Sequence, residues 1–114
     1  MSTQPSADLL RGSSDLLILS VLLDGPKYGY LIQQRLDEAS GGIVRLQAGT
    51  LYPILHRLEA QGLLKSRTES ETGRKRKWYD LTAKGRRRLE KQAVQWNELA
   101  NCLRILLKPV LETP

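Results

Sequence analysis

The chain has 114 residues, 40% of them hydrophobic, and a formal net charge of +6. This length suits one compact domain with an additional helix and is too short for two independent cores. No apolar run reaches the roughly 18 to 20 residues that span a bilayer. The first residues, MSTQPSAD, lack the basic and apolar segments of a secretory signal. We therefore expect a cytoplasmic protein.

Cysteine and histidine each occur once, as Cys102 and His56. A single cysteine excludes an internal disulfide and a cysteine-based zinc site. A single histidine leaves too few members for a classical triad or a paired-histidine metal site. We expect no enzyme activity, no catalytic residues, no metal and no cofactor.

The positive charge is concentrated in one part of the chain. Residues 65–91 contain eleven basic and four acidic side chains, a local net charge of +7, whereas the rest of the chain sums to −1. A polyanion-binding protein concentrates its charge in this way, so nucleic acid is the leading candidate partner.

Two helices are predicted in the first half of the chain. Ser13 and Ser14 can cap a helix that runs to Leu23, before an Asp-Gly-Pro break, and its apolar sides predict core or subunit-interface packing. Residues 1–9 are expected to form a disordered tail. An amphipathic helix over 28–39 ends at Ser40-Gly-Gly, and residues 43–46 are a short strand candidate.

The next helix has a hydrophobic stripe formed by Leu51, Ile54, Leu55 and Leu58. If Thr50 is its N-cap, Pro53 lies in the first turn, where its missing N–H costs nothing; if the helix starts a turn earlier, Pro53 should bend it. Gly62 is expected to end the helix. The opposite face is small, polar and basic, and consists of Gly49, Pro53, His56, Arg57 and Ala60, flanked by Thr50 and Tyr52.

A β-hairpin follows, with strands over 63–70 and 77–81 and a basic tip over 71–76. Tyr79 and Leu81 should share the face that packs on the helices, while Asp80 and Trp78 face the other way.

Thr82 can cap a long final helix that runs to about Lys108, before Pro109. Its apolar residues alternate at spacings of four and three, which keeps one seam facing a partner helix. This apolar seam would be exposed to solvent in a monomer, so we expect a homodimer. The interface is expected to include Leu89, Trp96, Leu99, Leu103, Leu106 and Leu107.

The predicted order of elements is that of a winged helix-turn-helix, a mostly α fold with a small β-hairpin, followed by a long C-terminal dimerisation helix. We expect the DNA-binding domain over 10–81, the dimerisation helix over 82–108 and a tail over 109–114. A helix fits the major groove and a wing reaches neighbouring phosphates. The candidate DNA contacts are Thr50, Tyr52, Pro53, His56 and Arg57 on the helix, and Arg74, Lys75, Arg76 and Lys77 on the wing.

Some of these residues have simpler interpretations. A basic hairpin tip alone is more often a solvated loop, and the helix before it is what makes DNA contact the stronger interpretation. Arg86, Arg87 and Arg88 either flank the DNA or form a solvated face.

Three runs resemble the PadR family of regulators: LLDGPKYGYLI (22–32), GTLYPILHRLEAQGL (49–63) and GRKRKWYDLTAKG (73–85). The short C-terminal part is similar to the compact subgroup with a single dimerisation helix. The resemblance implies a bacterial homodimeric repressor, with the Gly-Thr-Leu-Tyr-Pro helix in the major groove and the basic wing beside it. It also implies a hydrophobic cavity at the dimer interface that accepts planar aromatic effectors, which here would place Trp96 in contact with the ligand.

Two roles are open for Trp96. A tryptophan on such a stripe usually serves interface packing. A flat indole near the two-fold axis, with the small Ala93 and Ala100 one turn away on either side, could instead stack on an aromatic ligand.

The leading functional prediction is repression through a dimer that occupies a palindromic operator and is released by an effector. A protein-interaction module is disfavoured because such interfaces are depleted in lysine. An enzyme is disfavoured because the chain offers no pair of nucleophile and base and no cluster of metal ligands. An architectural DNA binder would bind every duplex alike.

Overall fold

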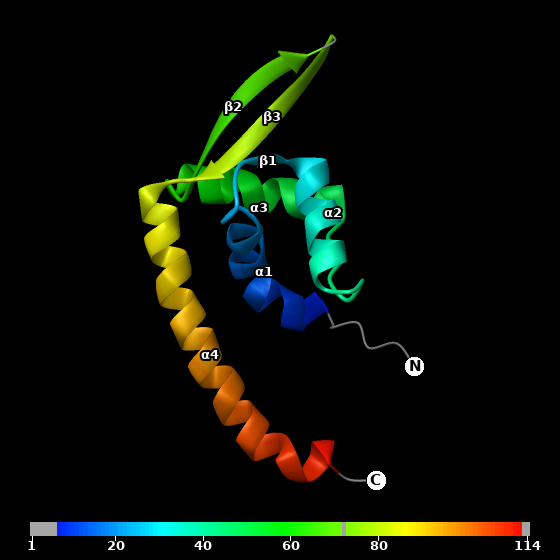
Figure 1. The fold of residues 1–114 in the computed structure, drawn as a ribbon, viewed down its shortest axis with the longest axis vertical. Helices are drawn as coiled ribbons and strands as arrows, with labels where there is room; N and C mark the ends of the chain where they lie inside the picture. Colours follow the sequence, from blue (N-terminus) through cyan, green and yellow to red (C-terminus); the bar gives the residue numbers. More distant parts are fainter. Residues whose placement is uncertain (1–6, 72, 113–114) are drawn as a thin grey trace.

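The computed structural model describes the backbone of residues 7–71 and 73–112, and the side chains of 13–70 and 73–112. Four helices and a small sheet follow one another along the chain (Figure 1). The predicted fold class is confirmed, although one of the three strands lies at a different place in the chain than expected. The elements in order are α1 (Ala7–Val21), β1 (Lys27–Tyr28), α2 (Gly29–Ala39), α3 (Ala48–Ala60), β2 (Leu64–Glu71), β3 (Arg74–Leu81) and α4 (Ala83–Leu111).

The sheet is antiparallel with strand order β1-β3-β2. The hairpin of β2 and β3 is the wing, and its register runs from Leu64 opposite Leu81 to Glu71 opposite Arg74. Both strands extend further toward the tip than the sequence predicted, so the basic residues Arg74 to Arg76 lie in β3 with Lys77 and not in a loop. Their side chains therefore alternate between the two faces of the wing.

The hydrophobic core lies between α1, α2, α3 and the base of the wing. The predicted stripe of α3 is confirmed, since Leu51, Leu55 and Leu58 are fully buried and Ile54 packs against them. Tyr79 is buried from the sheet side, and Leu81 is partly buried on the same face. The inward face of the hairpin is therefore the predicted one.

Helix α1 starts earlier and ends earlier than predicted. It begins at Ala7, so residues 7–9 belong to a helix rather than to a tail, and residues 1–6 lie outside the described part. It ends at Val21 because residues 22–24 form a turn, with Leu22 and Leu23 donating to the carbonyls of Leu19 and Ser20.

The strand predicted over residues 43–46 does not form. Val44 and Leu46 are buried and alternate with exposed neighbours, which is a strand-like pattern. Side chains take the backbone groups that a neighbouring strand would need: the Val44 N–H donates to Ser40 Oγ (2.8 Å), and Gln33 Nε2 donates to the Leu46 carbonyl (2.9 Å). The second neighbour of β3, besides β2, is β1, a two-residue strand at Lys27–Tyr28 that the sequence did not predict.

Helix α4 begins at the predicted cap, where Thr82 Oγ1 accepts a hydrogen bond from the Gly85 N–H (2.9 Å). It continues through Pro109 to Leu111, beyond the predicted end at Lys108. Proline removes only one helical hydrogen bond near a terminus, and the Glu112 N–H closes the last turn on the Lys108 carbonyl (3.0 Å).

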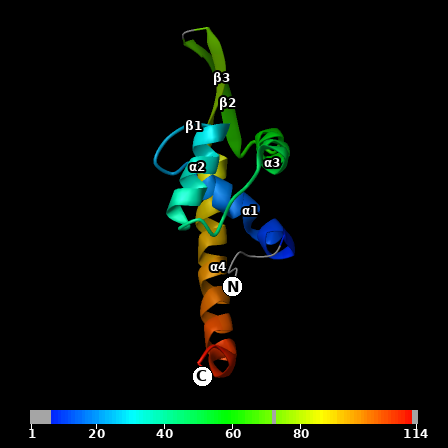
Figure 2. The ribbon, with the colours of Figure 1, turned by 90° about the vertical axis from the view of Figure 1, so that its right-hand side faces the viewer.

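The second half of α4 projects away from the body (Figures 1 and 2). The radius of gyration is 16.1 Å, against about 13 Å for a compact chain of this length. Within the described residues, none of the helices is both long enough and apolar enough to cross a membrane.

Candidate nucleic-acid interface

Helix α3 stands at one side of the molecule, with the wing rising beside it (Figure 2). Its N-cap is Gln47, so the helix starts before Thr50 and Pro53 lies inside it. The second of the two sequence alternatives for the helix start is therefore the correct one. Because proline has no N–H, the carbonyl of Gly49, four residues earlier, loses its helical donor.

We call the outward side of α3 the reading face. It consists of Gly49, Pro53, His56 and Ala60, all of which are exposed, and it is flanked by the exposed Thr50 and Tyr52. Burial of the leucines on the other side of α3 orients this face toward solvent, as the helical spacing predicted.

Tyr52 is held by the first residue of α2. A Cβ built on Gly29 would overlap the Tyr52 hydroxyl and lie 3.0 Å from its Cε1 atom, so the ring packs directly on the glycine backbone. Tyr52 is 40% exposed in this position. Its ring fixes α3 against α2 and leaves its edge at the flank of the reading face.

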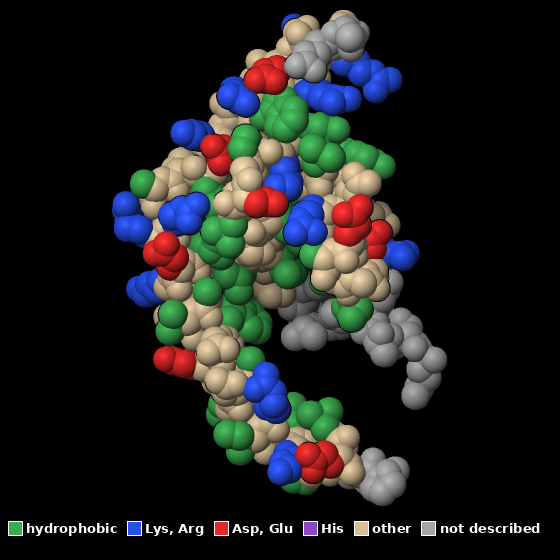
Figure 3. All heavy atoms as spheres, in the orientation of Figure 1, with side chains coloured by type: hydrophobic (Ala, Val, Ile, Leu, Met, Phe, Trp, Pro, Cys, Tyr) green, Lys and Arg blue, Asp and Glu red, His purple; other side chains and the backbone are tan. Residues whose placement is uncertain are grey.

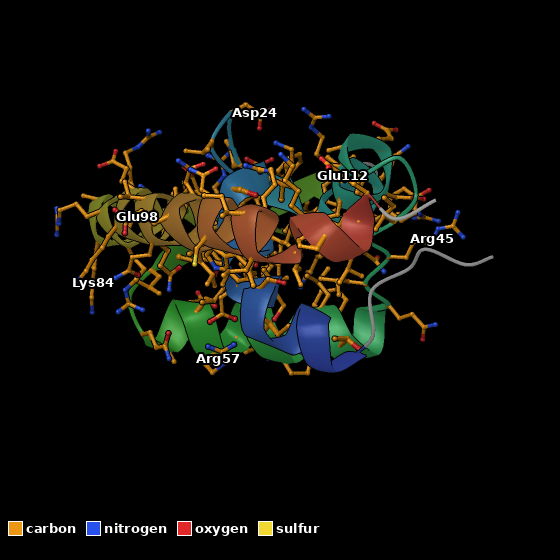
Figure 4. The ribbon with its side chains drawn as sticks, turned by 90° about the horizontal axis from the view of Figure 1, so that it is seen from below. Asp24, Arg45, Arg57, Lys84, Glu98 and Glu112 are labelled. Atoms are coloured by element: carbon orange, nitrogen blue, oxygen red, sulfur yellow. The ribbon has the colours of Figure 1, made fainter. Side chains whose placement is uncertain are left out.

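Arg57 lies on the opposite flank and forms a bidentate ion pair with Asp15 of α1. Its Nη1 and Nη2 atoms donate to the two carboxylate oxygens at 2.9 and 2.6 Å. Figure 4 places Arg57 where α3 meets α1. The hydrogen bonds that Arg57 donates to Asp15 raise the pKa of Arg57 above its ordinary value. The pair ties the reading helix to α1 and neutralises the charge that the sequence assigned to DNA contact.

Glu59 joins α3 to the wing. It accepts a hydrogen bond from Ser66 Oγ of β2, and its Oε1 lies 3.3 Å from Lys77 Nζ of β3. The hydrogen bond from Ser66 and the contact with Lys77 lower the pKa of Glu59, although burial opposes them. Lys77 also lies over the Tyr79 ring, 5.4 Å from its centroid. This network links the wing to α3.

Replacement of Glu59 by glutamine should lower the free energy of unfolding by about 0.5 to 1 kcal/mol at pH 7. The folded-state pKa of Glu59 is depressed, so its stabilisation is complete above the ordinary value of 4.5 and is lost as the pH falls below it. Urea unfolding at pH 7 and pH 3.5 tests this. A difference between the two proteins that stays equally large at pH 3.5 would contradict the assignment.

The other face of the wing carries an aromatic contact. Tyr28 of β1 and Trp78 of β3 meet edge to face, with ring centroids 5.0 Å apart, and Arg76 lies over the Tyr28 ring at 4.5 Å. Arg76 therefore stiffens the base of the wing through a cation–π contact. Asp80 and Trp78 are on this face, as predicted.

Arg74 and Lys75 remain at the outer end of β3, where both are exposed. Among the side chains that the structure describes, no hydrogen bond or ion pair engages either of them. Of the four basic wing residues, these two therefore present their charges to solvent.

Sequence reasoning missed the intramolecular partners Asp15, Ser66 and Tyr28. The predicted strand began at Lys77. Had it been extended to Arg74, the alternation of side chains along a strand would have placed Arg76 and Lys77 on opposite faces of the wing. The sequence contains no local signal for the Asp15 pair, because its members are 42 positions apart.

The residues predicted for the dimer interface separate into two groups. Leu89 is buried in the subunit's own core, so it is not available to a second chain, and this part of the prediction is corrected. Trp96 and Ala100 are partly buried, whereas Ala93 is exposed. The exposed leucines are Leu99, Leu103, Leu106 and Leu107.

A family model described as the transcriptional regulator PadR-like family matches residues 18–91, which include α2, α3, the wing and the first turns of α4. A transcriptional regulator of Mycobacterium tuberculosis is 39% identical over 90 residues, covering 79% of this chain and 81% of that protein.

Solved structures agree with this match. A PadR family transcriptional regulator from Eggerthella lenta has a TM-score of 0.75 and 36% identity, covering 94% of this chain and 88% of that one. A transcriptional regulator from Clostridium thermocellum has a TM-score of 0.80 and 30% identity, covering 88% of this chain and 95% of that one.

Proposed function

Because the chain belongs to the transcriptional regulator PadR-like family, we propose that it represses transcription as a homodimer on a palindromic operator. The protein is a transcriptional regulator and not an enzyme, like its family and its structural neighbours. The observation that carries the proposal is the exposed reading face of α3 beside a wing with exposed cations at its outer end.

We place the reading helix in the major groove and the phosphate contacts at Arg74 and Lys75. Thr50, Tyr52, Pro53 and His56 are proposed to lie against base edges or the adjoining backbone. The other predicted contacts, Arg57, Arg76 and Lys77, already have partners within the chain. They contribute mainly by holding the helix and the wing in place, and reach DNA only when those contacts open.

The proposed dimer is formed through α4. The face that buries Leu89 continues at a seven-residue spacing through Trp96 and Leu103, beyond the end of the subunit's own core. Figure 3 shows hydrophobic side chains along the lower half of α4, beside the hollow below the body. A second copy of the same helix is the occupant whose pattern matches this face.

Release by a planar aromatic effector is the finer part of the proposal. Partly buried Trp96, with Ala93 and Ala100 next to it, would line a ligand site between two copies of α4. Titration of planar cationic and phenolic compounds, followed by tryptophan fluorescence in a Trp78→Phe variant, reports on Trp96 alone. Absence of quenching and of any loss of DNA binding would count against this site.

DNA binding is tested by mobility shift of the purified protein on its own upstream intergenic DNA, across a salt series and against excess unrelated DNA. Specific retention that weakens as salt rises is expected. Each of Arg74→Ala and Lys75→Ala should reduce the slope of log affinity against log salt by about two units, because each dimer loses two phosphate contacts of about 0.9 unit. An unchanged slope in both variants would remove the wing tip from the interface.

Other outcomes of this experiment identify the alternatives. Equal, salt-dependent binding to every duplex would indicate an architectural DNA binder. Absence of binding to any duplex would favour a protein-interaction module built on the same apolar helices.

A further inference from the structure

Few polar groups of α3 are free to read a base edge. Arg57 donates through both terminal nitrogens to Asp15, and Glu59 is engaged by Ser66 and Lys77 of the wing. The Tyr52 ring is held on the Gly29 backbone. Among the described residues, this leaves two exposed hydrogen-bonding side chains, His56 at the centre of the reading face and Thr50 at its flank.

The rest of the reading face is small and apolar. Pro53 and Ala60 are exposed, and a Cβ built on Gly49 has no atom within 4 Å, so no described residue covers the helix at this point. In the major groove, the C5-methyl group of thymine is the apolar feature that distinguishes one base from the others. An apolar helix surface that approaches closely is therefore suited to this methyl group, and poorly suited to guanine, whose edge presents two acceptors.

We propose that the reading helix recognises thymine in each operator half-site, through contact of Pro53 with the thymine C5-methyl group. Gly49 allows the close approach of the helix backbone, and His56 supplies one hydrogen bond to a neighbouring base or phosphate. This inference rests on the proposed DNA-binding function and makes Pro53 a specificity-determining residue. Recognition of guanine by Arg57 would instead require the bidentate pair with Asp15 to open.

The test uses duplexes that the full-length protein selects from a random library. Each enriched duplex is synthesised again with dUTP in place of dTTP, which removes every thymine methyl group and leaves base pairing intact. The selected motif should contain a fixed thymine in each half-site. The uracil duplex should bind on the order of tenfold more weakly, since one methyl contact is lost in each half-site.

Two variants show whether Pro53 makes the contact. Pro53→Ser should bind the thymine and uracil duplexes with equal affinity. Pro109→Ser, the same change at an exposed position near the other end of the molecule, should keep the full discrimination. Circular dichroism checks that both variants retain their helices. We expect them to, because proline is unfavourable inside a helix and its replacement should not disrupt it.

Each remaining outcome is informative. Equal affinity of the wild-type protein for the thymine and uracil forms of a selected duplex overturns thymine recognition, but does not contradict the proposed function as a regulator. A penalty for uracil that persists in Pro53→Ser assigns the effect to DNA shape or to another residue and overturns the role of Pro53. Failure to enrich any motif overturns both this inference and the proposed operator binding.

Discussion

Replacement of Gly85 by alanine is expected to lower the free energy of unfolding by about 3 kcal/mol. A Cβ at this position would overlap the carbonyl oxygen of Leu63 and lie 3.0 Å from its carbonyl carbon. The first turn of α4 would have to move away from the turn that precedes β2. It would then weaken the hydrogen bonds of Thr82 to the carbonyls of Leu63 (3.1 Å) and Gly62 (2.6 Å).

Urea unfolding measures this loss, and thermal unfolding should show a decrease in Tm of roughly 10 °C. Gly49→Ala is the matched control, since it makes the same change within a helix where a Cβ meets no atom within 4 Å. Its stability should be unchanged or slightly higher. A Gly85→Ala protein as stable as wild type would contradict the close approach of α4 to Leu63.

Replacement of Leu103 by glutamate is expected to convert the proposed dimer to a monomer. Leu103 is 42% exposed in the single chain and lies on the helix face that continues from Leu89. A carboxylate there would be buried between the two α4 helices, where it loses its hydration. Operator affinity should fall by at least about a hundredfold, because each subunit would then bind a half-site alone.

Light scattering coupled to size exclusion measures the oligomeric state, and mobility shift measures the affinity. Val94→Glu is the control, because Val94 is 60% exposed and lies nine residues from Leu103, about 180° around the helix. This variant should remain dimeric. A dimeric Leu103→Glu protein, or a monomeric Val94→Glu protein, would place the interface on another face.

The helices and their inward faces were largely predictable. The spacing of Leu51, Leu55 and Leu58 predicted the orientation of α3, and Thr82 predicted the start of α4. These features depend on residues within one or two turns of each other, so local periodicity and capping are sufficient to specify them. The boundaries were less accurate, since Pro109 did not end α4 and residues 43–46 did not form a strand.

Residue types and their order along the chain were enough to indicate a basic winged helix-turn-helix with an apolar seam on its last helix. They could not indicate which basic residues already have partners. Only folding brings Asp15 to Arg57, Glu59 to Lys77 and Tyr28 to Arg76, and leaves Arg74 and Lys75 exposed at the outer end of the wing. The physical reason is that sequence periodicity assigns a side chain to a face of its own element, whereas its partner comes from another element that the tertiary structure positions opposite that face.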